Sequence, residues 1–131
     1  MLTLGSILQC WSKKIPVSDP CVAEAVAINW ALEIALIENF RDIFVEGDAQ
    51  ICMSAINGPA IAILWKIQTI VFNVKLLAAS FISCSFYWVR RDANCVAHSL
   101  AKFASSQLSC FQCNNSNLPP SVREAWLRDL V

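Results

Sequence analysis

At 131 residues the chain has room for one domain with a buried core and is short for two. Hydrophobic residues make up 56% and charged residues 15%, which excludes a disordered chain and predicts elements that are buried on more than one face. Ten basic residues balance ten acidic ones, so broad electrostatic binding of nucleic acid is excluded and any phosphate contact is expected to be local.

The first half of the chain predicts alternating strands and helices. Asp19 is a preferred helix cap and Pro20 suits a first helical turn, while Asn39 is a plausible residue at the C-terminal end of that helix. The apolar run Ile43-Phe44-Val45 is typical of a strand covered on both faces. The expected elements are a strand over 2–15, a helix over 20–38, a strand over 41–46 and a short helix over 49–57.

The second half continues the alternation. Asn57-Gly58-Pro59 stops the short helix, and Asp92 is expected to cap a later one. The expected elements are a helix from about Ala62 to Ala79, a strand over 81–89, a helix over 93–106, irregular chain over 107–117 and a terminal helix over 121–130. Strands alternating with helices in this way predict an α/β layer fold with some parallel pairing.

Composition also bears on where the protein is expected to reside. The most apolar window, Ile61 to Ile82, is interrupted by Lys66, Gln68 and other polar residues, so it favours a buried helix over a membrane span. No signal peptide is seen at the N-terminus. Seven cysteines, an odd count without a framework spacing, indicate reduced thiols that mostly fill the core. We therefore expect an intracellular protein, nuclear or cytoplasmic, with no membrane partner.

Glu24 is the first candidate for chemistry, because it lies early in the long helix on a face that continues through Ile28, Ala31 and Ala35. Asn29 and Glu33 share another stripe that suits solvent. One interpretation of Glu24 is a snorkelling glutamate, stabilised near the positive end of the helix. The other is a metal ligand.

Asp48 is the second candidate, because it follows a buried strand, and open α/β sheets bind ligands at the carboxyl ends of their strands. The simpler interpretation is an N-cap for the helix that begins at Ala49. A helix carboxylate facing a strand-end carboxylate would form half of a divalent-cation site for phosphodiester hydrolysis, and magnesium prefers such hard oxygen ligands.

A third feature follows the second-half strand, where Arg90-Arg91 precede Asn94 and His98 on one helix face. Either Asn94 or His98 could contact a phosphate. The simpler interpretation is that Asn94 bonds locally in the first turn and that His98 is a satisfied, partly buried histidine.

Several separate segments together resemble plant ribonuclease H-like domains of the reverse-transcriptase-associated type. The matching segments are Ala23-Glu24-Ala25-Val26-Ala27, Trp30-Ala31-Leu32, Val45-Glu46-Gly47-Asp48, the run from Val89 to Lys102, and Leu118-Pro119-Pro120 followed by Trp126-Leu127. Their order and spacing also agree, over roughly Leu4 to Leu130. The helix motif between Asp92 and Lys102 is the most specific of them.

The resemblance implies a ribonuclease H-like three-layer α/β fold, in which a mixed sheet lacks its first two strands and has helices packed on it. We expect an N-terminally truncated domain over residues 1–106 and a C-terminal tail with a short helix over 107–131. Relatives place four acidic residues in the site. Glu24 and Asp48 match two of them, His98 stands at the fourth position, and the first aspartate has no counterpart before Glu24.

The activity that the resemblance implies is hydrolysis of RNA in RNA–DNA hybrids with magnesium or manganese, impaired or lost in this chain. Catalytic roles would fall to Glu24, Asp48 and His98, and metal binding to Glu24 and Asp48. One alternative is a non-catalytic module that binds nucleic acid. Another is a retroelement-derived remnant that pairs with a partner strand or with itself through an exposed strand edge. The nucleic-acid contacts would come from Arg90, Arg91, Asn94 and Lys102.

Overall fold

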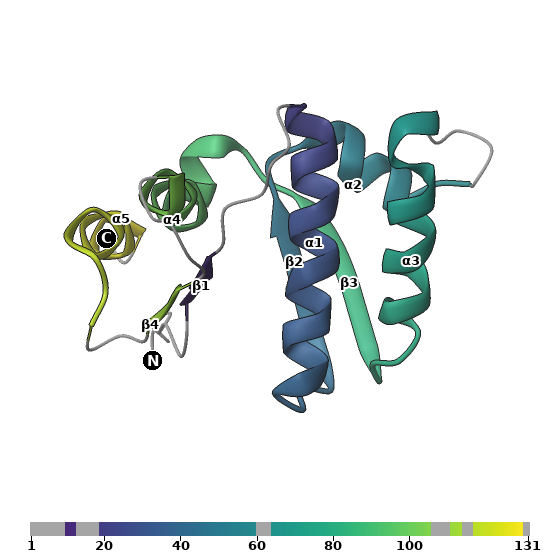
Figure 1. Ribbon diagram of the computed structural model, residues 1–131, viewed down its shortest axis with the longest axis horizontal. Coiled ribbons are helices and arrows are strands. Elements are labelled where there is room, and N and C mark those ends of the chain that lie inside the picture. The colour runs from purple at the N-terminus through teal and green to yellow at the C-terminus, as the bar shows by residue number, and fades with distance from the viewer. Residues whose placement is uncertain (1–9, 13–18, 60–63, 106–110, 114–116, 130–131) are drawn as a thin grey trace. The chain divides into compact units, whose positions relative to one another are not determined.

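The chain, seen in a computed structural model (Figure 1), divides into two compact units. One unit spans residues 17–90, and the other combines 1–16 with 91–131. The structure describes residues 10–12, 19–59, 64–105, 111–113 and 117–129.

The unit of residues 17–90 begins with helix α1, Pro20–Ile37. Its N-cap is Asp19, whose Oδ1 accepts hydrogen bonds from the backbone N–H of Cys21 (2.8 Å) and Val22 (3.2 Å). These bonds satisfy donors that the first turn of a helix leaves without partners. Beyond the helix end, Asn39 adopts the left-handed conformation with φ 63°, which asparagine tolerates. Both predicted helix ends are therefore confirmed.

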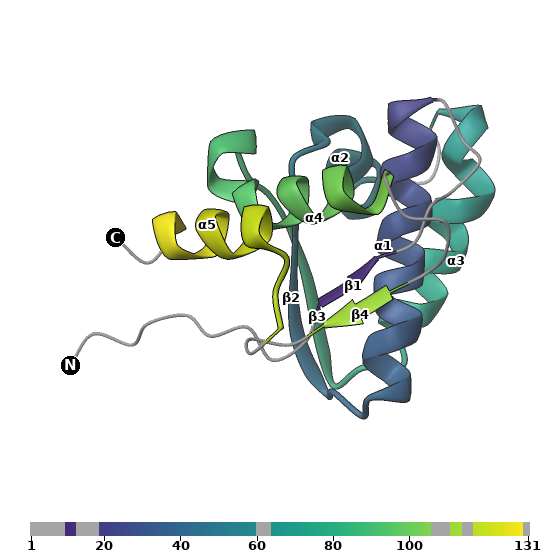
Figure 2. The same cartoon turned by 60° about the vertical axis from the view of Figure 1, so that its left-hand side comes forward.

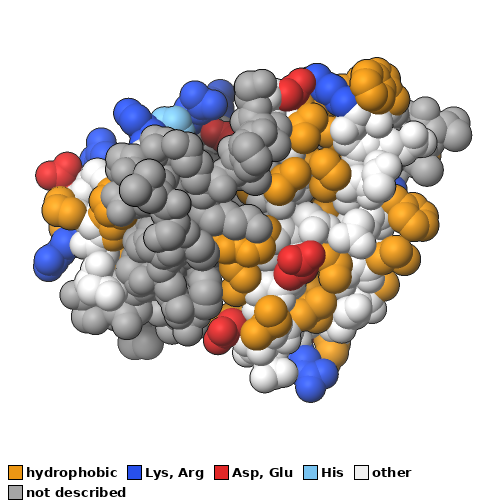
Figure 3. All heavy atoms as spheres, in the orientation of Figure 1, with side chains coloured by type: hydrophobic (Ala, Val, Ile, Leu, Met, Phe, Trp, Pro, Cys, Tyr) orange, Lys and Arg blue, Asp and Glu red, His pale blue; other side chains and the backbone are white. Residues whose placement is uncertain are grey.

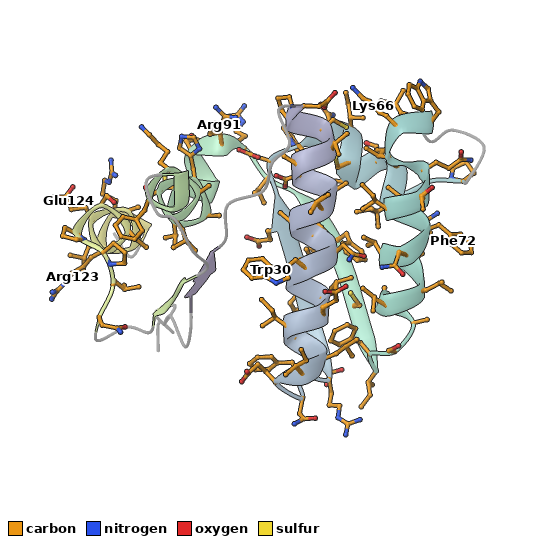
Figure 4. All side chains as sticks on the ribbon, viewed as in Figure 1. Trp30, Lys66, Phe72, Arg91, Arg123 and Glu124 are labelled. Carbon is orange, nitrogen blue, oxygen red and sulfur yellow. The ribbon has the colours of Figure 1, made fainter. Side chains whose placement is uncertain are left out.

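Asp19 also holds the start of α1 to a distant segment. Its Oδ2 lies 2.7 Å from Nζ of Lys66, in the short 3-10 helix η2, Trp65–Ile67. This bond to Lys66 is the main reason why the pKa of Asp19 lies below its usual value. Figure 4 shows Lys66 at the same end of the unit as the start of α1. Because both side chains are exposed to solvent, the pair orients the helices more than it stabilises them.

The sheet of this unit has two parallel strands, β2 (Asp42–Gly47) and β3 (Ser83–Trp88). Asp42 pairs with Ser83 at one end of the ladder and Gly47 with Trp88 at the other. The connection between the strands runs through α2 (Gln50–Asn57), η2 and α3 (Gln68–Ala78). Such a helical crossover is what parallel strands require.

Helices α1 and α3 lie on the same side of the sheet (Figure 2). The alternate residues Ile43, Val45, Cys84 and Phe86 pack against the core beneath these helices. The core comprises Ala25, Ile28, Leu32, Cys52, Met53, Ala55, Ile56, Ile67, Val71, Val74 and Phe81. The predicted apolar strand and long helix thus meet in one core, as the α/β interpretation requires.

The other residues of each strand form the opposite face of the sheet, which carries a polar and aromatic surface. Ser83 Oγ donates to Asp42 Oδ1 across the ladder (2.8 Å), and the rings of Phe44 and Tyr87 lie 5.8 Å apart at an angle of 52°. Phe44 keeps 75% of its surface exposed. The predicted burial of this strand on both faces is therefore not seen within the unit.

The second unit contains helices and a small antiparallel pair. Its elements are β1 (Cys10–Ser12), a 3-10 turn (Arg91–Asn94), α4 (Cys95–Ser105), β4 (Phe111–Cys113) and α5 (Pro120–Asp129). Strand β1 pairs with β4, and Trp11 lies opposite Gln112. Helix α5 packs on α4, and its Val122 and Ala125 are wholly buried. Helix α5 of the C-terminal tail therefore belongs to the same unit as α4, which overlaps the helix motif between Asp92 and Lys102.

Four local predictions need correction. The strand expected over 2–15 is described only as β1, and its remaining residues lie outside the described part of the chain. The stretch expected to be irregular, 107–117, contains β4, whose pairing partner lies about a hundred residues away and leaves no local signal. The helix expected from Ala62 begins as η2 at Trp65, and residues 60–63 are not described. Asp92 lies inside a 3-10 turn instead of capping α4.

Helix α1 is the segment of the described chain that is long and apolar enough to cross a membrane by length and composition. The described part of the window Ile61–Ile82, in which polar residues favour a buried helix over a membrane span, contains η2 and α3. In this structure Ala25, Ile28 and Leu32 of α1 are buried in the core of the unit.

The burial of α1 in the core predicts the effect of truncating its largest buried side chain, Leu32. Leu32 is 1% exposed, so Leu32→Ala should lower the free energy of unfolding by about 2–5 kcal/mol through lost burial and the cavity left behind. Leu76→Ala is the matched control, because Leu76 on α3 is 56% exposed and its truncation should cost less than about 0.5 kcal/mol. Urea unfolding monitored by circular dichroism measures both. Equal effects would contradict this account of the core.

Candidate functional site

Glu24 lies in the second turn of α1, half-buried, next to the wholly buried Ala25. Its carboxylate lies against the end of β2, where a Cβ built on Gly47 would approach Glu24 Oε1 to 2.6 Å and would also collide with Met53. Glycine at this position therefore leaves room for the carboxylate. Ala31, predicted to continue the packed face, is exposed, and the buried stripe of α1 is Ala25, Ile28 and Leu32.

Asp48 follows β2 directly and is half-buried. The structure excludes its expected role as a helix cap, because α2 takes Ala49 as its N-cap and has no side-chain cap hydrogen bond. The backbone carbonyl of Asp48 instead accepts a hydrogen bond from Trp88 Nε1 at 3.2 Å, which anchors this turn to the end of β3. Asp48 is therefore fixed at the carboxyl end of the sheet, where ligands bind in open α/β folds.

The negative charge of Asp48 acts on the carboxyl group of Glu24. The pKa of Glu24 is raised above its ordinary value, first because burial penalises the charged form and second because of the negative charge of Asp48. A raised pKa with these two causes is typical of acidic groups gathered at a functional site. A cation bound between the two carboxylates would offset both the cost of burying the charge of Glu24 and its repulsion by Asp48.

A divalent cation fits the chemistry of these groups, although the pair is not a complete cage. Carboxylate oxygens are hard ligands of the kind that Mg²⁺ and Mn²⁺ accept. Within the described residues, no group of three or more His, Cys, Asp or Glu side chains comes together to hold a metal. Magnesium is commonly held by one or two carboxylates together with substrate phosphates and water, and Glu24 with Asp48 match that mode.

The predicted phosphate contacts are divided between the units. Arg90 follows β3 and is exposed, at the end of the unit of residues 17–90. Arg91, His98 and Lys102 are exposed in the other unit, with His98 and Lys102 one turn apart on α4. Basic side chains lie on either side of the histidine in Figure 3. Asn94 belongs to the 3-10 turn before α4, and its side chain lies outside the described part.

His98 differs from its simpler interpretation, since its side chain is exposed and not partly buried. Glu24 and Asp48 belong to the unit of residues 17–90, whereas His98 belongs to the unit that contains α4. The structure thus brings together Glu24 and Asp48 from the set of predicted catalytic residues.

A shallow apolar groove of about 510 Å³ lies elsewhere, between α1 and α3. Hydrophobic side chains gather on this side of the unit (Figure 3). Asn73 Nδ2 donates to Asn29 Oδ1 (2.6 Å) within the groove, and the exposed Phe72 and Leu76 contribute to its wall. Neither Glu24 nor Asp48 lines it, so the groove is separate from the carboxylate pair.

Sequence reasoning missed two residues that shape the site. From sequence, Gly47 is only one member of the matching segment Val45-Glu46-Gly47-Asp48, although a glycine directly before a strand-end aspartate signals a close approach by another group. Trp88 was treated as one more strand residue, and no local pattern shows that its indole reaches the carbonyl of Asp48, forty residues earlier.

Parallel strands covered by α1 and α3, with a helix carboxylate beside a strand-end carboxylate, define an α/β protein of ribonuclease H-like class. A family model described as "Reverse transcriptase-like" matches residues 3–104. Since this is well over half of the sequence, the chain belongs to the reverse transcriptase-like family. No curated protein matches the chain.

The raised pKa of Glu24 predicts a pH-dependent effect on stability. A carboxyl group whose pKa is higher in the folded state contributes stability below its unfolded value of about 4.5, and this contribution is lost as pH rises through the folded value. Glu24→Gln removes the ionisation, so the variant should gain stability relative to the wild type as pH rises from about 4 to about 7. Urea midpoints measured across this range test it.

Glu33→Gln is the control for this prediction, because Glu33 is exposed on the same helix and accepts a hydrogen bond from Asn29 Nδ2. The Glu33→Gln variant should gain no stability relative to the wild type as pH rises. A Glu24→Gln curve that runs parallel to the wild-type curve at all pH values would contradict the burial of this carboxylate.

Proposed function

We propose that this chain is a ribonuclease H-like domain that binds RNA–DNA hybrids and cleaves their RNA strand slowly, with Glu24 and Asp48 holding a divalent cation. The observation that supports this most directly is the position of the two carboxylates at the carboxyl end of β2, where burial and the charge of Asp48 raise the pKa of Glu24. Membership of the reverse transcriptase-like family supports the nucleic-acid substrate.

When bound, Mg²⁺ or Mn²⁺ would activate water and stabilise the leaving oxygen of the phosphodiester. The side chains of the protein itself would hold the cation in place. Glu24 supplies a carboxylate on a rigid helix, and Asp48 supplies one on a turn anchored by Trp88. Gly47 leaves room for the Glu24 carboxylate, because a Cβ at this position would approach Glu24 Oε1 to 2.6 Å.

We infer slow cleavage because the described residues gather two carboxylates, whereas related sites use four. The exposed imidazole of His98 would bind a metal through nitrogen, which suits magnesium less than an anionic oxygen does. Fewer anionic ligands give weaker binding of the cation, so activity should require a high concentration of metal.

This proposal predicts metal-dependent cleavage of a labelled RNA–DNA hybrid. Asp48→Asn removes one anionic ligand and should lower the cleavage rate by more than about 100-fold at fixed Mn²⁺. Glu46→Gln is the control, because Glu46 is an exposed carboxylate on the same strand and its change should leave the rate unaltered. Gel analysis of end-labelled hybrid over a range of Mg²⁺ and Mn²⁺ concentrations measures all three proteins.

Cleavage that persists in Asp48→Asn would indicate a contaminating nuclease and contradict the proposed site. Wild-type protein that cleaves no more than buffer does, at any metal concentration, would exclude hydrolysis.

A second candidate, non-catalytic binding of nucleic acid, is favoured by the exposed basic residues of the unit that contains α4. Arg91, His98 and Lys102 are all exposed, and His98 and Lys102 share one face of α4. Because the chain has no net charge, binding would rest on a few local phosphate contacts and its salt dependence would be shallow.

Removing these contacts should weaken binding in a salt-dependent way. Arg91→Ala with Lys102→Ala should lower retention of hybrid and reduce the slope of log affinity against log salt by about one for each lost contact. Arg123→Ala is the matched control, an exposed arginine on α5 of the same unit (Figure 4). Filter binding at several salt concentrations measures both. An unchanged slope in the double variant would remove these residues from the interface.

A further inference from the structure

Two cysteines face each other near the carboxylate pair. Cys21 lies in the first turn of α1, and Cys52 lies in α2, where its neighbour Met53 packs over Gly47. Their sulfur atoms are 3.5 Å apart although the residues are 31 positions apart in sequence. The Cys52 thiol also donates a hydrogen bond to the backbone carbonyl of Cys21 at 3.2 Å. Both are free thiols.

The two thiols differ in accessibility. Cys52 is wholly buried, whereas Cys21 is half-buried at the start of its helix. Burial, and next the hydrogen bond with Cys21, raise the pKa of Cys52 to about 12, so this residue stays protonated at neutral pH. A reagent from solvent therefore meets Cys21 first, with Cys52 held behind it as a second thiol.

We propose that Cys21 and Cys52 form a site of oxidative modification, at which a peroxide creates a disulfide that joins α1 to α2. The proximity of the two sulfur atoms and their unequal exposure support this assignment. In reducing compartments such disulfides are typically transient and respond to oxidants.

The chemistry proceeds in two steps. The Cys21 thiolate attacks one peroxide oxygen and the O–O bond breaks, which gives a sulfenic acid on Cys21 and hydroxide, and the hydroxide takes up the proton released by Cys21 to become water. The Cys52 sulfur then attacks the Cys21 sulfur and the S–O bond breaks. The departing hydroxide takes the Cys52 proton and leaves as a second water. Two thiols lose two electrons in all, and the peroxide gains them.

The bond would act close to the candidate site. A disulfide needs its sulfur atoms at about 2.05 Å, so the side chains must move together and Cys52 must release the carbonyl of Cys21. Glu24 lies three residues after Cys21, and Asp48 lies four residues before Cys52. The bond would therefore tie α1, which carries Glu24, to α2, which begins two residues after Asp48. The proposal holds whether or not the chain cleaves nucleic acid.

Mass spectrometry of the full chain tests the proposal. After treatment with hydrogen peroxide, alkylation of the remaining thiols and proteolysis, we expect a Cys21–Cys52 linked peptide that lacks two hydrogen atoms and that dithiothreitol separates. Cys84→Ser is the matched control, because Cys84 is another half-buried free thiol and its loss should leave the linkage intact.

Cys52→Ala should leave the sulfenic acid of Cys21 without a partner, so that dimedone labels Cys21 in this variant and much less in the wild type. Wild-type protein in which Cys21 and Cys52 are both alkylated after peroxide treatment would overturn the proposal, whatever the variants do. Peroxide-induced linkages of Cys21 to other cysteines in place of Cys52 would overturn it as well.

Discussion

The unit of residues 17–90 depends on the burial of α1 and α3 against one face of two parallel strands. A pair of parallel strands has no hairpin turn to hold its register and gains little stability from its own ladder. The stripe of Ala25, Ile28 and Leu32 supplies the missing contacts, together with Val71 and Val74 of α3. Glu24 lies next to this stripe, and its Oε1 lies against the end of β2 at Gly47.

The position of Glu24 near Asp48 has an electrostatic cost. Glu24 is partly desolvated and faces the charge of Asp48, an arrangement that weakens the folded state at neutral pH in the absence of a counter-charge. A protein selected for stability alone would place an apolar residue here. Groups that destabilise the fold cluster at sites of function, and this supports the assignment of the pair as a cation site.

Local chemistry explains why part of the structure was predictable from sequence. Asp19, Pro20 and Asn39 mark the ends of α1 through bonds to adjacent backbone, and the apolar run at Ile43 marks a strand. The features that the sequence did not predict depend on contacts between residues that are far apart in the chain. Strand β4 exists because β1 pairs with it, and the position of Asp48 depends on the indole of Trp88. The positions of Glu24 and Asp48 on a helix and at a strand end, together with the family resemblance, predicted them as site residues, whereas the thiol pair has no sequence signal, since 31 residues separate its members.

The edges of the parallel sheet are not equivalent. Backbone donors at Ser83 and Val89 reach toward β2, so the intervening residue Phe86 turns its carbonyl outward, where it accepts a hydrogen bond from the Asn57 side chain at 3.0 Å. This bond occupies one acceptor on the β3 side, while no strand among the described residues pairs with the far side of β2. The two edges of the sheet therefore differ in what they contact, although both strands run in the same direction.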